Sequence, residues 1–537
     1  MTQAEDGNQR WTSRWAAALE VALIFLLFFL YAGWPPPDVN EAHYLAKAKH
    51  YWQPDWCPTD HFLTSADAHL VFYWTFGWLT RLAPLDLVAW VGRFLTWSLL
   101  AWSWRRLSWA VVPQPFASLL TACAFLLFNN RFHMAGEWVV GGVEAKGLAY
   151  ALVFFALGSL LRQRWNAAWI LLGVATAFHP LVGGWSLLAA GCSWLSCQHS
   201  RPPFVKMLPA LCAGLVLALP GLIPALLLNR GVEAEVIRQA NMIYVYGRLP
   251  HHLVFHRFPH AYMARHAFLL LLWLAACRAT PCQLSAGVVG QRPLRGFVGG
   301  AVLIAILGIV IDQSLLYHLD VAAGLLRYYW YRLSDAILAA GAALAVVGWV
   351  LALRATRPAW GTAALVVAVL AAGGNLAWTN YQRRSDLRPQ ADVQVLPAWP
   401  DDPARTDRTY DDWRQACRWI AENTPTDACF ITPKMQQTFK WYAERSEVCC
   451  GKDVPQDAVR LGEWWQRQRD LYPRKVAAGG LVAHGESGLR ELAQKYGADY
   501  VVLDRSASAR PLLFRRVYPP ALSITPSVYE VYVVDHP

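Results

Sequence analysis

Long apolar segments recur through the first 380 residues, and they constrain the fold more than any other feature of the chain. Crossing a bilayer takes roughly 20 residues of α-helix, and many of these segments approach that length. They lie at 15–34, 85–104, 108–128, 147–162, 165–180, 182–198, 206–228, 263–277, 297–316, 332–354 and 360–379. We therefore expect a polytopic α-helical membrane domain over residues 1–379, with about 11 transmembrane helices.

Basic residues between these segments predict the topology. The apolar but short stretch from His69 to Arg81 decides it, and we expect that stretch to lie flat in the interface as an amphipathic segment. Arg105, Arg162, Arg201 and Arg354 then all face the cytoplasm, as the positive-inside bias requires. The same bias explains much of the net charge of +11, so we expect no nucleic-acid partner. The chain is predicted to be a multi-pass protein of a bacterial inner (cytoplasmic) membrane, with its C-terminal domain extracytoplasmic.

This topology gathers polar segments on the external side. The main external loops are expected at 35–84, 129–146, 229–262 and 317–331, and acids, imidazoles and arginines are frequent in them. Most of the candidate site residues lie in these loops, while His179 lies at the turn before the sixth segment and Arg332 at the start of the tenth. The full set is Glu41, His43, Tyr44, Asp60, Glu137, Glu144, Lys146, His179, Arg248, His251, Arg327, Tyr328 and Arg332.

The tail is predicted to be a soluble domain. Residues 380–409 are polar and contain several prolines, which is typical of a linker. From 410 to 537, helical and strand patterns alternate, which favours a small α/β domain. Cys417, Cys429, Cys449 and Cys450 lie in it, and a disulfide such as Cys417–Cys429, or one using Cys449, is open if the domain is external.

The first external loop carries the most informative motif. Pro35-Pro-Pro-Asp-Val-Asn-Glu41-Ala-His43-Tyr44 follows the first apolar segment directly. It places a carboxylate, an imidazole and a phenol within one helical turn of each other, where the chain leaves the bilayer. His69-Leu-Val-Phe-Tyr-Trp-Thr-Phe-Gly77 and Val91-Gly-Arg93-Phe-Leu follow it, and Glu137 and Glu144 lie in the second loop.

In these features the first 160 residues resemble the GT-C glycosyltransferases, multi-span enzymes that take a sugar from a polyprenyl-phosphate carrier. The resemblance implies a first-loop acid at Glu41, a flat juxtamembrane helix from His69, and a second-loop acid at Glu144 or Glu137. It implies a polyprenyl-phosphate-linked sugar donor, contact with membrane lipids, and a glycan, lipid or protein acceptor. The chain departs from the family in two places: its first acid is followed by His, and its second loop has no Asp-x-Asp.

Each candidate has a role in this hypothesis. Glycosyl transfer needs a base for the acceptor hydroxyl and stabilisation of the phosphate leaving group. Glu41 is the predicted base, and Glu144 is predicted to assist it. Arg248, Arg327 and Arg332 are candidate phosphate clamps, because guanidinium binds phosphate oxygens bidentately. No cofactor is predicted with certainty; a divalent cation is left open, and no metal ligand is assigned.

Simpler interpretations stand beside these. Glu41 could be a solvated acid, Glu144 and Lys146 an ion pair, and His179 a helix cap. Interfacial arginines also extend to lipid head groups without any substrate. At the level of the whole chain, the alternatives are a catalytically silent GT-C-like scaffold and a lipid or solute transporter.

Overall fold

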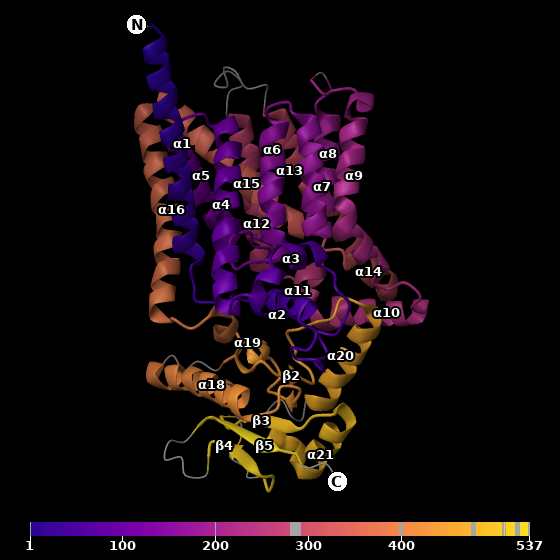
Figure 1. Cartoon of the computed structure of the whole chain (residues 1–537). Helices are drawn as coiled ribbons and strands as arrows, with labels where there is room; N and C mark the ends of the chain where they lie inside the picture. Colours follow the sequence, from indigo (N-terminus) through magenta and orange to yellow (C-terminus); the bar gives the residue numbers. More distant parts are fainter. Residues whose placement is uncertain are drawn as a thin grey trace.

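The chain forms a helical bundle with a smaller mixed domain at one end (Figure 1). A computed structural model describes all residues except 1, 199, 280–290, 397–400, 474–479, 507, 509, 511, 521–526 and 535–537, and it gives no side-chain description for residues 2–13. In the described part, one helix corresponds to each predicted apolar segment. These helices are α1 (Thr2–Ala32), α4 (Leu85–Val111), α5 (Ala117–Arg131), α6 (Ala145–Leu160), α7 (Trp165–Phe178), α8 (Pro180–Ser196), α9 (Phe204–Leu227), α12 (His260–Ala279), α13 (Arg292–Ser314), α15 (Arg332–Thr356) and α16 (Pro358–Ser385).

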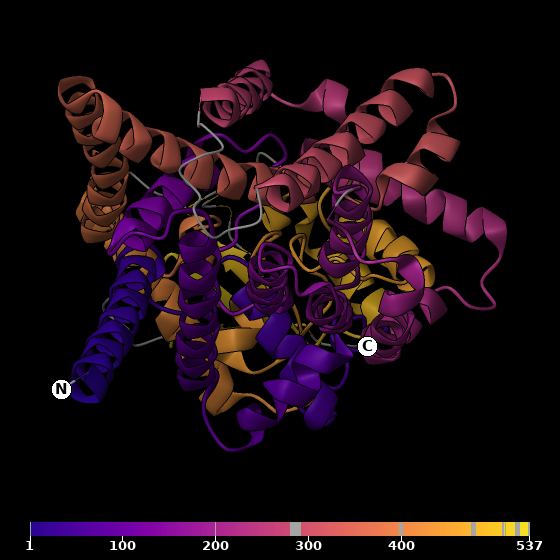
Figure 2. The same ribbon diagram turned by 90° about the horizontal axis from the view of Figure 1, so that it is seen from above.

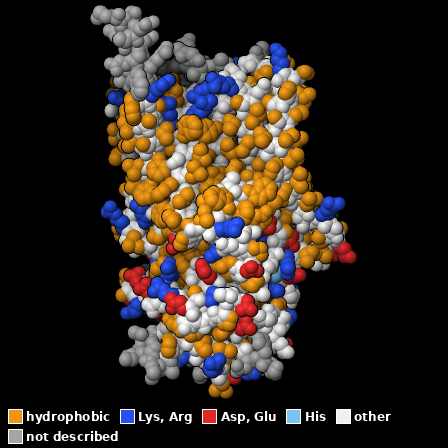
Figure 3. Space-filling model, in the orientation of Figure 1, with side chains coloured by type: hydrophobic (Ala, Val, Ile, Leu, Met, Phe, Trp, Pro, Cys, Tyr) orange, Lys and Arg blue, Asp and Glu red, His pale blue; other side chains and the backbone are white. Residues whose placement is uncertain are grey.

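Six of the described helices are long and apolar enough to cross a membrane by themselves. They are α1 from Arg14, α9, α12, α13, α15 and α16. Helices α6 and α7 are apolar but shorter, so the expected count of about 11 is supported for part of the bundle only. A broad band of hydrophobic side chains covers the face of the bundle seen in Figure 3, with charged side chains above and below it. The protein is therefore a multi-pass helical membrane protein.

The connections at the two ends of the bundle differ in kind. The long polar loops and the tail lie at one end, opposite the N-terminus (Figure 1). The stretch predicted to lie flat forms two short helices, α3 (Leu70–Thr75) and η1 (Gly77–Arg81), both too short to cross. They pack beside α2, α10, η2, α11, η3 and α14 in a layer between bundle and tail. The bounds of these elements are Glu41–Trp52, Ala234–Met242, Ile243–Arg248, Pro250–Leu253, Phe255–Arg257 and Leu319–Leu326.

The tail contains a five-stranded sheet of order β2-β1-β3-β5-β4. Strands β2 (Ser446–Glu447), β1 (Cys429–Ile431) and β3 (Tyr500–Asp504) run parallel, and β5 (Tyr529–Val533) and β4 (Arg516–Tyr518) continue the sheet antiparallel. Viewed along the bundle, the tail lies behind the helices (Figure 2). Its described helical elements are α17 (Gln390–Val393), α18 (Pro403–Asn423), α19 (Phe439–Ala443), α20 (Ala458–Leu471), η5 (Leu481–His484) and α21 (Gly485–Tyr496).

Three expectations for the tail need correction. Helix α18 begins inside the predicted linker, because the Asp402 side chain caps its first turn and Pro403 occupies its first position. Residues 397–400 of that linker lie outside the described part. Strand β4 was not predicted, since its three residues are too few for a periodic pattern. The ten described cysteines are free thiols, so neither of the disulfides left open by the sequence, Cys417–Cys429 or one using Cys449, is formed among the described residues; Cys417 is fully buried in the core.

Asp392 gives the tail a testable pH dependence. Its buried carboxylate accepts hydrogen bonds from Thr438 (2.7 Å) and Tyr442 (2.7 Å), and burial raises its pKa to about 6. In the folded state Asp392 therefore keeps its proton up to about pH 6, whereas in the unfolded state it loses that proton near pH 4. As the pH rises from about 4 to about 6, the free energy of unfolding falls by roughly 3 kcal/mol.

We expect Asp392→Asn to have little effect near pH 4 and to raise the thermal unfolding midpoint of the full chain at pH 7.5. The measurement is the difference in midpoint between variant and wild type across this range. A difference that does not change with pH would contradict the assignment.

Candidate functional site

Glu41, the predicted base, lies at the start of α2 in a fully buried ion pair with Arg93 of α4. Its Oε1 accepts from Arg93 Nε (2.6 Å) and Val143 N (2.7 Å), and its Oε2 accepts from Arg93 Nη2 (2.5 Å) and Asp38 N (2.7 Å). Both side chains are 0% exposed. Only glycine fits at position 142, because an added Cβ would lie 2.7 Å from the Glu41 side chain.

Every acceptor position of Glu41 is therefore occupied. A general base must reach the proton that it removes, and this carboxylate is enclosed by four donors. The geometry gives no support to Glu41 as the base, and it gives Glu41 a structural role instead. The Glu41–Arg93 pair joins the first loop, the second loop and α4.

The loop 129–146 is held by two polar residues that the sequence did not indicate as site residues. Asp335 of α15 accepts from the backbone N–H groups of Met134 (2.7 Å), Ala135 (2.9 Å) and Glu137 (3.1 Å). Asn129 of α5 bonds the carbonyl of Glu137 and the N–H of Val139. Both lie in apolar helices, where no local pattern indicates a partner in a distant loop.

This loop forms one wall of a small cavity of about 50 Å³ at the tail end of the bundle. Glu137 is paired with Arg332 (3.0 Å) and Lys146 (3.7 Å), and Lys146 also lies over the ring of Trp138 (3.6 Å). The cavity is lined by Asn40, Ala135, Gly136, Glu137, Trp138, Lys146, His252, Tyr329 and Arg332. Three of the predicted site residues, Glu137, Lys146 and Arg332, thus meet in one place.

Glu144 adjoins this cavity as the N-cap residue of α6. Its Oε2 accepts from Asn40 Nδ2 (3.2 Å) and lies 3.5 Å from Lys146 Nζ, and the residue is 3% exposed. Burial raises the pKa of Glu144, against the opposing charge of Lys146. Glu144 has fewer donors than Glu41 and is a stronger base than an ordinary carboxylate, so it is the better candidate for accepting a proton.

An aromatic and imidazole row leads away from the cavity. Tyr44 Oη lies 3.5 Å from His69 Nε2, and the His69 and His179 rings are 5.6 Å apart. His179 Nε2 lies 3.3 Å from Arg332 Nη1, and its Nδ1 accepts from Val182 N at the start of α8. His179 therefore caps a helix, as the simpler interpretation has it, and also touches the site.

Two cations near Glu144 have no acidic partner within ion-pair distance in the described part of the chain. Arg248 donates to the carbonyl of Gly451 (3.2 Å), and Lys452 donates to Gln394 (3.3 Å). Burial and the charge of Arg248 lower the pKa of Lys452, against the opposing effects of Cys450, Asp453 and, least, Glu144. Burial and both cations lower the pKa of His251. Lys452 was missed because no motif surrounds it and it reaches the site from the tail.

Arg327 and Tyr328, two further candidates, lie apart from the cavity. Arg327 bonds Asn241 Oδ1 of α10, and Tyr328 is half exposed next to it. His252 Nδ1 lies 2.5 Å from the Ala135 carbonyl oxygen, whereas His256 pairs with Asp312 (3.0 Å). His252 and His256, which both lie in the loop 229–262, therefore point to different partners and do not form one site.

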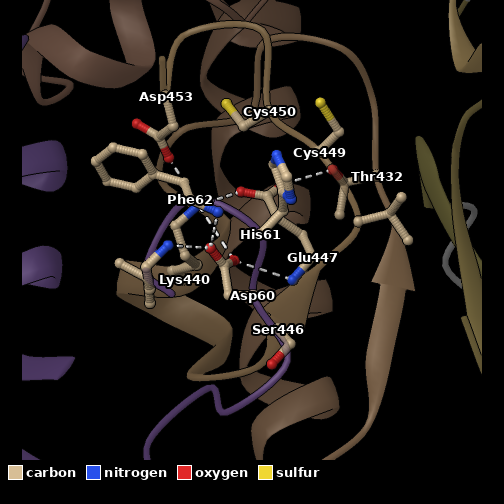
Figure 4. Close-up of polar contacts among 12 residues, drawn as sticks. Asp60, His61, Phe62, Thr432, Lys440, Ser446, Glu447, Cys449, Cys450 and Asp453 are labelled. Atoms are coloured by element: carbon tan, nitrogen blue, oxygen red, sulfur yellow. Dashed lines mark hydrogen bonds and ion pairs between the residues drawn. The ribbon is translucent and has the colours of Figure 1, made fainter. Parts of the chain in front are cut away.

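Asp60 and His43 belong to a second cluster, between the first loop and the tail (Figure 4). Its centre is Lys440 of α19, whose Nζ lies 2.5 Å from Glu447, 2.7 Å from Asp453 and 3.5 Å from Asp60. His43 Nδ1 lies 3.4 Å from Asp453. Lys440 and the three carboxylates are each 1% exposed, so this cluster ties the two parts together without contact with solvent.

The same cluster contains a group of potential metal ligands. Side-chain atoms of Glu447, Cys450 and Asp453 lie within 4.8 Å of one another. The ammonium group of Lys440 already supplies a cation to Glu447 and Asp453. A metal ion would have to displace it, so these residues do not fit a resident metal well.

Comparisons with known proteins add limited information. A family described as a domain of unknown function, DUF6798, matches residues 411–471. No curated protein matches the chain at a significant level. One similar solved structure is an oligosaccharyltransferase from Archaeoglobus fulgidus in complex with zinc and sulfate (13% identity, TM-score 0.40, covering 91% of this chain and 68% of that one). Another is the oligosaccharyltransferase AglB from the same organism with an inhibitory peptide and a dolichol-phosphate (12%, 0.40, 92% and 70%). At this level of similarity the structures assign no residue of the site.

Proposed function

We propose that the protein is a membrane glycosyltransferase that moves a sugar from a polyprenyl-phosphate carrier to an acceptor at the tail end of the bundle. One observation carries the proposal: Arg248 and Lys452 have no carboxylate within ion-pair distance in the described part of the chain, and the charges of Arg248 and of Glu144, a buried carboxylate of raised pKa beside a small cavity, both act on Lys452. The first-loop resemblance to GT-C enzymes points to the same chemistry.

The residues divide into two roles. Arg248 and Lys452 would bind the donor phosphate, because unpaired cations in a partly desolvated site attract an anion strongly. Lys146 and Arg332 hold Glu137 and border the small cavity, beside which the sugar would lie.

Glu144 would act as the base. As the acceptor oxygen attacks the anomeric carbon, its proton passes to Glu144, and the bond from that carbon to the phosphate oxygen breaks. The phosphate leaves with the electron pair and is stabilised by the two cations. Glu41 would position Glu144 only indirectly, through its hydrogen bond to Val143 N.

We expect Glu144→Gln to keep carrier binding and to lower sugar transfer by about 10²–10⁴-fold, the usual contribution of a general base. We expect Lys452→Gln and Arg248→Gln each to weaken carrier binding by roughly tenfold or more, since hydrogen bonds to charged groups contribute about 1.5–3 kcal/mol. Arg238→Gln is the matched control, because Arg238 is half exposed and pairs with Glu235.

The measurement uses the full chain in lipid nanodiscs. Native mass spectrometry would follow binding of undecaprenyl phosphate, and release of sugar from a glycosyl undecaprenyl phosphate would be assayed with membrane extract as acceptor source. Carrier binding by wild type that is lost in the Lys452 and Arg248 variants supports the proposal. Wild type that does not bind the carrier would refute the donor assignment and favour a scaffold or a transporter. Transfer that Glu144→Gln leaves unchanged would exclude Glu144 as the base.

A further inference from the structure

A second pocket lies at the junction of the membrane domain and the tail, between the start of α4 and helices α18 and α19. Its volume is about 190 Å³. The polar and aromatic residues that line it are Asp86, Arg414, Arg418, Trp441, Tyr442 and Glu444. The cavity described above shares none of these residues.

The pocket presents two guanidinium groups from one face of α18. Arg414 and Arg418 are four residues apart, so they are neighbours on the helix surface. Arg414 lies over the ring of Tyr442 (4.0 Å) and donates to Tyr410 Oη (3.4 Å). Within the described ranges, neither arginine has a carboxylate within ion-pair distance.

The two acids of the pocket are engaged by other donors. Asp86 accepts from Trp441 Nε1 (2.7 Å), and Glu444 accepts from Lys49 Nζ (3.1 Å). Lys49 adds a positive charge behind Glu444. The pocket therefore contains two guanidinium groups and two carboxylates, of which Glu444 is paired with Lys49 outside the lining and Asp86 acts on Arg414 through its charge. With Lys49 counted, the positive charges exceed the negative ones, which favours an anion.

Lipid-facing surface adjoins the pocket directly. Asp86 lies in the first turn of α4, and the apolar side chains around it are exposed: Leu82 is 75% exposed, Leu87 54% and Val91 46%. An apolar surface that ends at a pair of arginines matches a molecule with acyl chains and an anionic head group.

We infer that this pocket binds the head group of a membrane phospholipid, with its phosphate on Arg414 and Arg418 and its acyl chains along α4. Guanidinium groups bind phosphate oxygens bidentately. The volume is below the roughly 300–1,000 Å³ of sites for drug-sized ligands, which suits a head group and excludes an oligosaccharide. The bound lipid would join the tail to the membrane domain.

The test is phospholipid retention by the full chain extracted in mild detergent, measured by native mass spectrometry and phosphorus analysis. We expect wild type to retain phospholipid, and Arg414→Gln/Arg418→Gln to retain at least tenfold less. Arg408→Gln is the matched control on the same helix, since its one ion pair, with Asp402, is exposed and lies outside the pocket. The variant Arg418→Glu alone guards against misfolding, because that side chain is exposed and its carboxylate would repel phosphate.

Two results would overturn the inference. One is equal phospholipid in wild type, in the Arg418→Glu variant and in the control. The other is a thermal stabilisation of wild type by inorganic phosphate alone with no retained lipid, which would indicate a free-anion site. Neither outcome depends on carrier binding at Glu144, so this inference and the proposed function fail separately.

Discussion

Glu41→Gln is expected to destabilise the protein strongly, in contrast to what a catalytic base would do. The substitution removes the ion-pair partner of the buried Arg93, leaving only the weaker charges of Asp38 and Asp86 to act on it, and turns an amide N–H toward other donors. Breaking a buried ion pair by removing one partner costs about 3–5 kcal/mol. The measurement is the thermal unfolding midpoint of the full chain in detergent, followed by tryptophan fluorescence.

Two further variants sharpen this experiment. Glu41→Gln/Arg93→Met removes both charges and should recover part of the lost stability, because replacing a whole buried pair by apolar groups is often neutral. Glu235→Gln is the control, as Glu235 is half exposed on α10. A Glu41→Gln protein with the wild-type midpoint and no transfer activity would restore Glu41 as the candidate base.

Lys440→Met is expected to have the second largest effect, on the attachment of the tail. Without the ammonium group, Asp60, Glu447 and Asp453 are three buried carboxylates with no central cation. Removal of one partner from such a cluster costs about 3–5 kcal/mol. We expect a lower unfolding midpoint and faster proteolytic release of the tail.

The pH dependence of this variant has a definite sign. Burial raises the pKa of Glu447 to about 7 against the opposing charge of Lys440, so loss of that charge raises the pKa of Glu447 further. Lowering the pH therefore protonates Glu447 in the variant before it does so in wild type, and this removes one of the uncompensated charges. The difference between Lys440→Met and wild type should therefore shrink from pH 8 to pH 6. Lys495→Met is the control, since Lys495 is half exposed in its pair with Asp470. Equal midpoints for the two lysine variants at pH 8 would show that the cluster does not hold the tail.

Local sequence was sufficient for the helices and for the mixed character of the tail. Glu137 was predicted as an acid of the second loop and Lys146 from its place next to an apolar segment, and the structure brings both to Arg332 at one cavity. Asp335 was not predicted, because its hydrogen-bond donors are backbone N–H groups of a loop about 200 positions away, and no pattern in the neighbouring sequence indicates them.

The sequence by itself determined that this chain is a multi-pass helical protein with a mixed α/β tail, because apolar length and periodicity are properties of neighbouring residues. Only the tertiary structure decided which charges are free to act. Glu41 is separated from Arg93 by 52 positions, and Asp60 from Glu447 by 387. The pairing of a buried charge depends on which distant segment lies against it. Glu41, which the sequence predicted to be a catalytic base, is for this reason held in a buried ion pair with Arg93.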